Sequence, residues 1–200
     1  MRNGIFAAVL LAALPLCASA SGGEAEGAPV PGAGTKSIVV YFSATGNTKA
    51  VAEKIAKFTG SEIMEIEPEE KYTDADLNWH DGESRSSVEM NDEGSRPAIK
   101  ADSKAFGDYG TVFLGYPIWW GKAPRVLYTF VEKHSFAGKT VIPFCTSGSS
   151  PAGESAKILE ELTGNKGTWK EWKEAKRFAE HPSESEIGAW LSEIGYGVKR

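Results

Sequence analysis

Short runs of β-branched and aromatic residues recur along the chain, separated by segments in which apolar residues follow a helical spacing. Such runs, bounded by glycine, proline and small polar residues, predict buried strands. The predicted strands are Ser37–Phe42, Glu62–Ile66, Thr111–Leu114, Thr140–Cys145 and a short one around Lys176–Phe178.

Amphipathic helices are predicted between and after these strands. They cover Thr48–Phe58, a segment from Pro124 to Val131, a segment from about Pro151 to Leu162, and Ser183–Ile194. Pro124 suits a first helical turn, and Ser183 with Glu186 forms a capping box. This alternation predicts an α/β fold, a doubly wound, five-stranded parallel sheet with helices on both faces.

The N-terminal segment has the pattern of an export signal. Arg2 precedes the apolar run Gly4–Leu16, and Ala18–Ala20 supplies the small residues of a cleavage site. The run is too short for a bilayer span, which needs about 20 residues. We expect a periplasmic or extracellular protein. The alternative is membrane attachment by a lipid on Cys17, although bulky Leu16 is a poor residue before a lipidated cysteine.

The domain organisation follows from this pattern. Residues 21–35 are rich in glycine and lack aromatics, which predicts a flexible linker. The predicted parts are a signal peptide over 1–20, the linker over 21–35 and one folded domain over 36–200.

Composition excludes several classes of protein. The 200 residues carry 27 Asp and Glu against 22 Lys and Arg, which argues against a general nucleic-acid binder. Loss of Arg2 with the signal would move the net charge from −5 to −6, and an acidic surface can steer a protein toward basic partners. Two cysteines cannot form a disulfide scaffold, and no His/Cys cluster has metal-ligand spacing. Cys145 is interpreted as a small buried hydrophobe.

The chemistry is expected where strands end, because doubly wound sheets bind ligands at the carboxyl ends of their strands. The loop after the first strand reads Ser43, Ala44, Thr45, Gly46, Asn47, Thr48. A helix start with neutral donors forms an anion site. Because the lysine of a nucleotide-hydrolase loop is missing, a phosphate monoester that is held without being cleaved fits best. Ordinary N-capping is the alternative.

Two further loops complete the predicted site. The loop after the third strand contains three aromatics and consists of Gly115, Tyr116, Pro117, Ile118, Trp119, Trp120 and Gly121. Two adjacent tryptophans cannot both face one core, so one is expected to line a pocket. The loop after the fourth strand offers polar donors from Thr146, Ser147, Gly148 and Ser149. Together the three loops predict a site for a flat, phosphorylated heterocycle, with no metal.

From about Ser37 to Ile194 the chain resembles flavodoxin-like FMN proteins, and specifically the branch with the Gly-Tyr-Pro-Ile-Trp-Trp-Gly loop. The resemblance implies FMN as cofactor and the phosphate on the loop that contains Thr45–Thr48. It also implies the flavin ring beside Gly115–Gly121, with Trp119 as the stacking aromatic, and a second flavin loop at Thr146–Ser149.

The chain departs from that family in two places. Residues 146–150 contain no aromatic that could cover the second flavin face. The segment Glu67–Asp108 between the second and third strands is long, and its Tyr72 or Trp79 is a candidate for that cover. Alternatively, both aromatics anchor the segment to the body of the domain.

We expect the protein to bind FMN and to transfer electrons between partner proteins or membrane carriers. We also expect it to be a monomer. The alternative is an FMN-dependent NAD(P)H:quinone-type oxidoreductase, which an open flavin face favours and export opposes. A third hypothesis is a ligand-binding protein that has lost FMN. A signalling receiver domain shares the fold but needs acidic residues where Ser43 and Gly115 stand.

Overall fold

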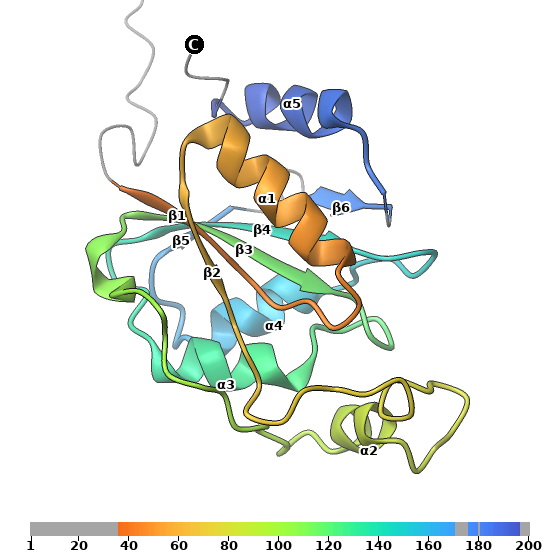
Figure 1. Cartoon of the computed structure of the whole chain (residues 1–200). Coiled ribbons are helices and arrows are strands. Elements are labelled where there is room, and N and C mark those ends of the chain that lie inside the picture. Colours follow the sequence, from red (N-terminus) through yellow and green to blue (C-terminus); the bar gives the residue numbers. More distant parts are fainter. Residues whose placement is uncertain (1–35, 171–175, 180, 197–200) are drawn as a thin grey trace, which may run out of the picture.

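The computed structural model describes residues 36–170, 176–179 and 181–196. The predicted signal peptide, Cys17 and the linker fall outside the described residues. Figure 1 shows the described helices and strands arranged around one sheet.

A parallel sheet forms the centre of the domain (Figure 1). Its strand order is β2-β1-β3-β4-β5, and β6 pairs with β4 as well. The chain order reverses between β1 and β3, which is the place where doubly wound sheets bind ligands. The strands are β1 Ser37–Tyr41, β2 Glu62–Glu65, β3 Thr111–Pro117, β4 Thr140–Thr146, β5 Thr168–Trp169 and β6 Lys176–Phe178.

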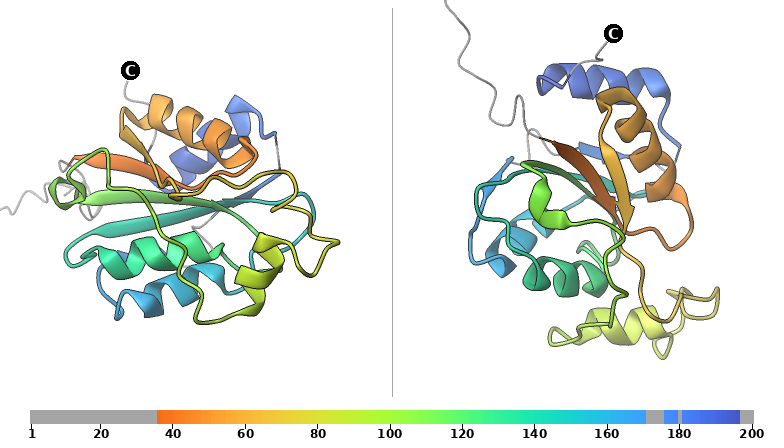
Figure 2. Two further views of the ribbon diagram at one scale, coloured as in Figure 1. Left: turned by 60° about the horizontal axis from the view of Figure 1, so that its bottom comes forward. Right: turned by 60° about the vertical axis from the view of Figure 1, so that its left-hand side comes forward.

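Helices cover both faces of the sheet (Figures 1 and 2). One layer holds α1 and α5, and the other holds α3 and α4. The four helices are α1 Asn47–Thr59, α3 Arg125–Lys133, α4 Ser155–Leu162 and α5 Glu184–Glu193. The expected doubly wound α/β fold is therefore confirmed.

Side chains of each central strand divide between two apolar cores. From β1, Val39 and Tyr41 pack on the side of α1 and α5, whereas Ile38 and Val40 pack with α3 and α4. Successive side chains of a strand point to opposite faces, and both faces are covered here. This is why the strand has a continuous apolar sequence without polar alternation.

The far edge of the sheet differs from expectation, because two short strands share the position beside β4. β5 pairs with the beginning of β4 at Thr140 and Val141, and β6 pairs with its end at Phe144–Thr146. Sequence pattern predicted only the second of these. A run of two residues is too short to give a periodic signal, so β5 is set by its pairing with β4.

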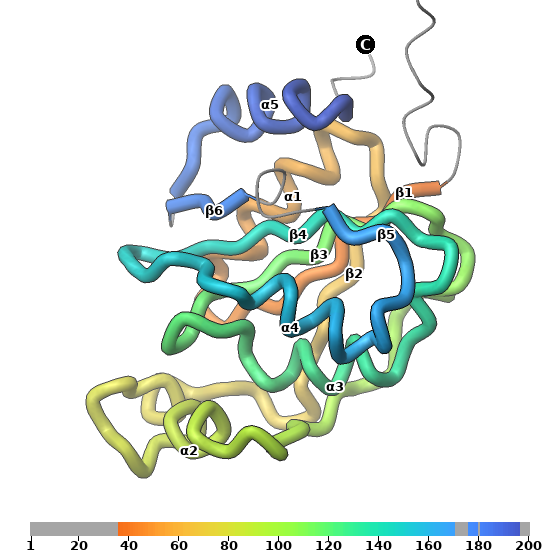
Figure 3. The backbone as a smooth tube through the Cα atoms, turned by 180° about the vertical axis from the view of Figure 1, so that it is seen from behind, coloured from red at the N-terminus to blue at the C-terminus, as the bar shows by residue number. Residues whose placement is uncertain are grey.

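The long segment between β2 and β3, residues 67–108, contains α2 Arg85–Asn91 and a short 3-10 turn at Phe106–Asp108. It is called the insert below. In Figure 1 and in the view from behind in Figure 3, α2 lies beyond α3, outside the helix layers that cover the sheet. No periodic pattern predicted α2, and its start is capped by Ser84, whose hydroxyl accepts from the Ser87 amide.

Buried polar contacts attach the insert to the body of the domain. The guanidinium of Arg125 donates to the carbonyls of Glu89 and Met90, at 3.2 and 2.9 Å, where α2 ends. The Thr129 hydroxyl donates to the Pro97 carbonyl at 2.9 Å. Because these donors come from α3, the insert is held at a fixed position relative to the sheet. Within the described residues no helix is long and apolar enough to cross a membrane.

Candidate functional site

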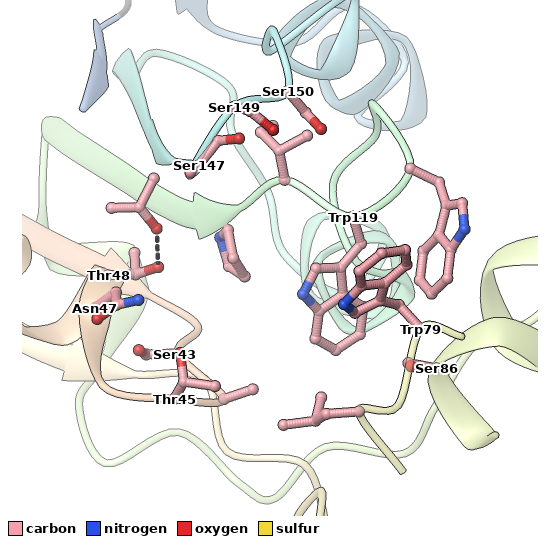
Figure 4. Close-up of a pocket in the computed structure, with 17 residues that line it drawn as sticks. Ser43, Thr45, Asn47, Thr48, Trp79, Ser86, Trp119, Ser147, Ser149 and Ser150 are labelled. Carbon is pink, nitrogen blue, oxygen red and sulfur yellow. Dashed lines mark hydrogen bonds between the residues drawn. The ribbon is translucent and has the colours of Figure 1, made fainter. Parts of the chain in front are cut away.

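A cavity of about 500 Å³ lies at the carboxyl ends of β1, β3 and β4, where the strand order reverses (Figure 4). Three strand-end loops and the insert contribute to its wall. The lining residues are Ser43, Ala44, Thr45, Asn47, Thr48, Leu77, Trp79, Ser86, Pro117, Ile118, Trp119, Trp120, Thr146, Ser147, Gly148, Ser149 and Ser150.

The start of α1 forms one end of the cavity. Gly46 is the N-cap residue with φ at 90°, a left-handed conformation that favours glycine, and no side chain caps the helix. The Gly46 amide itself donates to the Ser43 hydroxyl at 3.1 Å. First-turn amides of a helix have no partner inside the helix, so they can bind an anion here. No acidic residue lies in this turn to oppose an anion.

A buried hydrogen bond joins this helix start to the loop after β4. The hydroxyls of Thr48 and Thr146 lie 2.8 Å apart (dashed in Figure 4). Both threonines line the cavity, and both are almost fully buried. The bond fixes the spacing of two loops that are 98 residues apart in sequence.

The loop after β3 ends in a tight turn. The amides and carbonyls of Trp119 and Lys122 pair with each other at 3.0 and 2.9 Å. Between them Trp120 and Gly121 have φ values of 47° and 75°, the combination found in a type I′ turn. A tryptophan is rare in this conformation, which costs on the order of 1–3 kcal/mol and tends to occur at functional sites. Trp120 lines the cavity while its side chain is 49% exposed.

Trp119 is held by two aromatic neighbours. Its ring meets those of Phe42 and Tyr72 edge to face, with centroids 5.8 and 5.3 Å away. These contacts come from the end of β1 and from the insert, so the ring is oriented before any ligand arrives. Trp119 therefore supplies a rigid aromatic wall to the cavity.

The insert's two aromatic candidates have different positions. Tyr72 does not line the cavity; its hydroxyl donates to the Glu89 carboxylate, and the Arg85 guanidinium lies 4.2 Å from its ring centre. Burial and the neighbouring carboxylate raise the pKa of Tyr72. Trp79 lines the cavity and is 66% exposed, with its ring against His80. The anchoring role thus fits Tyr72, and Trp79 is the aromatic placed at the cavity.

Most residues of the three predicted loops come together at this cavity, but four do not line it: Gly46, Gly115, Tyr116 and Gly121. Gly46 and Gly121 shape the backbone of their loops, and Tyr116 is buried in the core with its hydroxyl 3.2 Å from that of Ser155. Leu77, Ser86 and Ser150, which are not among the predicted site residues, also line it. Leu77 and Ser86 belong to no motif, so only the position of the insert identifies them.

The described lining of the cavity consists of neutral side chains. Among the described residues that line it, none carries a charged side chain. The fixed positive potential comes from the start of α1. In the described parts of the chain no group of His, Cys, Asp and Glu side chains has an arrangement that could hold a metal ion.

Cys145 lies in β4 next to this region and is buried. Desolvation by burial raises the pKa of its thiol to about 12, although Arg177 acts in the opposite direction. Because the thiolate is the reactive form, we expect alkylation at pH 8 to be on the order of 1,000-fold slower in the folded than in the unfolded protein. Peptide mass spectrometry after iodoacetamide labelling, with and without guanidinium, measures the ratio. Equal rates would contradict the buried assignment.

Comparison with known proteins agrees with this fold. The flavodoxin family model matches residues 36–194, and the chain belongs to this family. Two solved proteins provisionally designated flavoproteins are similar over 80% of this chain. The one from Bacteroides eggerthii is 47% identical with a TM-score of 0.71 and 98% of it covered. The one from Bacteroides uniformis is 43% identical with a TM-score of 0.73 and 99% covered.

A third solved structure shares the fold at lower identity. It is a flavoprotein from Lactobacillus acidophilus in complex with FMN, 22% identical, with a TM-score of 0.57. The match covers 78% of this chain and 98% of that one. No curated protein gives a significant match.

Proposed function

We propose that this flavodoxin-family protein binds FMN and transfers electrons between partner proteins or membrane carriers. The observation that carries the proposal is one cavity with an uncapped helix start at one end and tryptophans at the other. This arrangement fits a phosphate joined to a flat aromatic ring. The FMN complex of the Lactobacillus flavoprotein, which has the same fold, supports the choice of cofactor.

The phosphate of FMN would be held at the start of α1. Amides of the first turn would donate to the anion, and the hydroxyls of Ser43, Thr45 and Thr48 would add neutral donors. With no lysine in this loop, the phosphate is bound by donors and the helix dipole alone. Riboflavin, which lacks the phosphate, should therefore bind more weakly than FMN.

The flavin ring would lie against the tryptophans. Trp119 is oriented by Phe42 and Tyr72, so stacking on it requires little loss of side-chain freedom. The loop Thr146–Ser149 would border the ring with hydroxyls and backbone amides. FMN supplies the redox chemistry when bound, while these residues orient the ring and limit its contact with water.

We propose Trp79 as the cover of the second ring face. It replaces the aromatic that the loop after β4 lacks, and it enters the cavity from the insert. Because its side chain is 66% exposed, a bound ring would bury apolar surface that is now in water.

Replacing Trp79 with alanine is then expected to weaken FMN binding by roughly 3- to 10-fold, since one stacking face is lost. FMN fluorescence should also be quenched less in the complex. The measurement is a fluorescence titration of the apoprotein with FMN. Val88→Ala, which shortens an exposed apolar residue of the same insert outside the cavity wall, is the matched control. If both variants bound FMN like the parent, Trp79 would have no role as cover.

The nature of the electron donor is decided by a second measurement on the same holoprotein. Under anaerobic conditions, NADH or NADPH should leave the flavin absorbance unchanged within minutes, whereas dithionite should bleach it. Rapid bleaching by a nicotinamide would favour the NAD(P)H:quinone-type oxidoreductase instead. A protein that binds no flavin after reconstitution would exclude both functions.

The proposed partners follow from charge and export. Exposed carboxylates of Asp74, Asp81 and Glu83 lie in the same loop of the insert as Trp79, which favours partners with a basic docking face. The N-terminal sequence supports export, and reduced nicotinamides are cytoplasmic. The electron source proposed is therefore a membrane component or another exported protein.

A further inference from the structure

An unsatisfied hydroxyl lies in the wall of the cavity. Among the described residues, only two buried side-chain oxygens have no hydrogen-bond partner, Ser86 Oγ and Thr111 Oγ1. Ser86 is 2% exposed and lines the cavity. A buried hydroxyl without a partner costs free energy, so its retention at a cavity wall calls for a ligand atom that completes it.

The hydroxyls of two neighbouring serines, unlike that of Ser86, have hydrogen-bond partners. Ser84 and Ser87 are buried in the same turn, and their hydroxyls bond each other at 2.9 Å. Ser87 also donates to the Asp81 carbonyl at 2.7 Å. These two hydroxyls therefore stabilise the start of α2, whereas that of Ser86 takes no part in the local structure.

The position of Ser86 is fixed from both ends of α2. Its own amide donates to the Asp76 carbonyl at 3.0 Å, and Arg125 binds the carbonyls where α2 ends. The backbone of Ser86 is thus held in place before a ligand binds, and a single side-chain torsion sets the position of its hydroxyl. A short side chain on a fixed backbone adds affinity because little conformational freedom has to be lost on binding.

The location of Ser86 indicates which part of a ligand it meets. In Figure 4 it lies with Trp79 and Trp119, on the side of the cavity away from Asn47 and Thr48. The phosphate end is therefore distant, and the neighbours of Ser86 are the aromatics proposed to hold the ring. An isoalloxazine ring has one apolar edge and one edge with carbonyl and nitrogen atoms, and only the latter can bond a hydroxyl.

We propose that Ser86 is a positioning residue that hydrogen-bonds the polar edge of the flavin ring. This inference rests on FMN binding as proposed above. It assigns a function to a residue of the insert that carries no motif. It also orients the flavin, because a ring turned by half a rotation would bring its apolar edge to this hydroxyl.

Ser86→Ala tests the proposal through binding and stability together. We expect both FMN and riboflavin to bind roughly 10-fold more weakly, by the same factor, because the contact is with the ring. The visible absorption band of bound flavin should shift relative to the parent holoprotein. The free energy of unfolding of the apoprotein should stay equal or rise, since an unsatisfied hydroxyl is removed.

Thr111→Val is the matched control, because it removes the other unsatisfied buried hydroxyl. Thr111 begins β3, six residues before Pro117 at the cavity, a distance of about 20 Å along the strand. Thr111→Val should bind FMN and riboflavin with the same affinities as the parent protein.

Any of four results would overturn the inference. Unchanged flavin affinity in Ser86→Ala would show that the hydroxyl contacts no ring atom. The same would follow if Ser86→Ala and Thr111→Val lost flavin affinity by the same factor. A loss seen for FMN but not for riboflavin would move the contact to the phosphate. A parent protein that bound neither flavin would instead refute the proposed function, and this inference with it.

Discussion

Replacing Trp119 with alanine should weaken FMN binding by roughly 10- to 100-fold, because one stacked face of the ring is lost. Stacking of a base on an aromatic side chain contributes about 1–3 kcal/mol, and we apply the same scale to the flavin ring. The ring of Trp119 is fixed by Phe42 and Tyr72, so this stacking partner is preorganised. Fluorescence titration of the apoprotein measures the change.

Trp119→Ala also removes the packing contacts of the ring, so a control has to distinguish weaker FMN binding from a loss of folded protein. Trp119→Phe keeps an aromatic face and should recover most of the affinity. Trp169→Phe alters a buried tryptophan beside Phe136, at the end of the sheet where β4 begins, and should leave FMN binding unchanged. If Trp119→Ala bound FMN as tightly as the parent, the stacking residue would be Trp120 or Trp79.

Gly115→Ala is expected to have the largest effect on stability. A Cβ added at Gly115 would lie 2.6 and 2.8 Å from the Cε atoms of the Phe144 ring, with Cζ closer still. The two residues are register partners on β3 and β4, both in the centre of the sheet. Overpacking of this kind costs about 1–3 kcal/mol or more, so we expect a loss of roughly 3 kcal/mol in the free energy of unfolding.

Chemical denaturation measures that loss, and a second substitution tests its cause. Phe144→Leu in the Gly115→Ala background should restore part of the stability, because the smaller side chain makes room for the added methyl group. Gly107→Ala, where the added Cβ meets open space, should change stability little. A Gly115→Ala protein as stable as the parent would show that the Phe144 ring can move aside.

These two predictions assign different roles to neighbouring residues of one motif. Gly115 is required by the packing of β3 against the Phe144 ring on β4, and Trp119 by the ligand cavity. Tyr116, between them, is a core residue whose hydroxyl contacts Ser155. The first residues of the motif Gly-Tyr-Pro-Ile-Trp-Trp-Gly therefore belong to β3 and pack within the sheet. The later residues form the loop at the cavity.

Local features of the sequence were sufficient to predict the sheet and most of the cavity. The apolar run of Ser37–Tyr41 and the capping box of Ser183 with Glu186 act over a few residues, so pattern alone identifies the strand and the helix. The order of strands and helices then places the loops after β1, β3 and β4 at one edge. Each of these loops is contiguous in sequence, and for this reason its residues could be selected together.

Tertiary structure alone decided the features that depend on distant partners. The sequence contains Tyr72, Trp79 and Ser86 within one insert, but nothing local distinguishes an anchor from a cavity residue. Their roles follow from where Arg125 on α3 holds α2, which places Trp79 and Ser86 in the wall and Tyr72 against Trp119. The two-residue β5 likewise exists through its pairing with β4. Side-chain burial in these cases is set by long-range packing, which local periodicity does not encode.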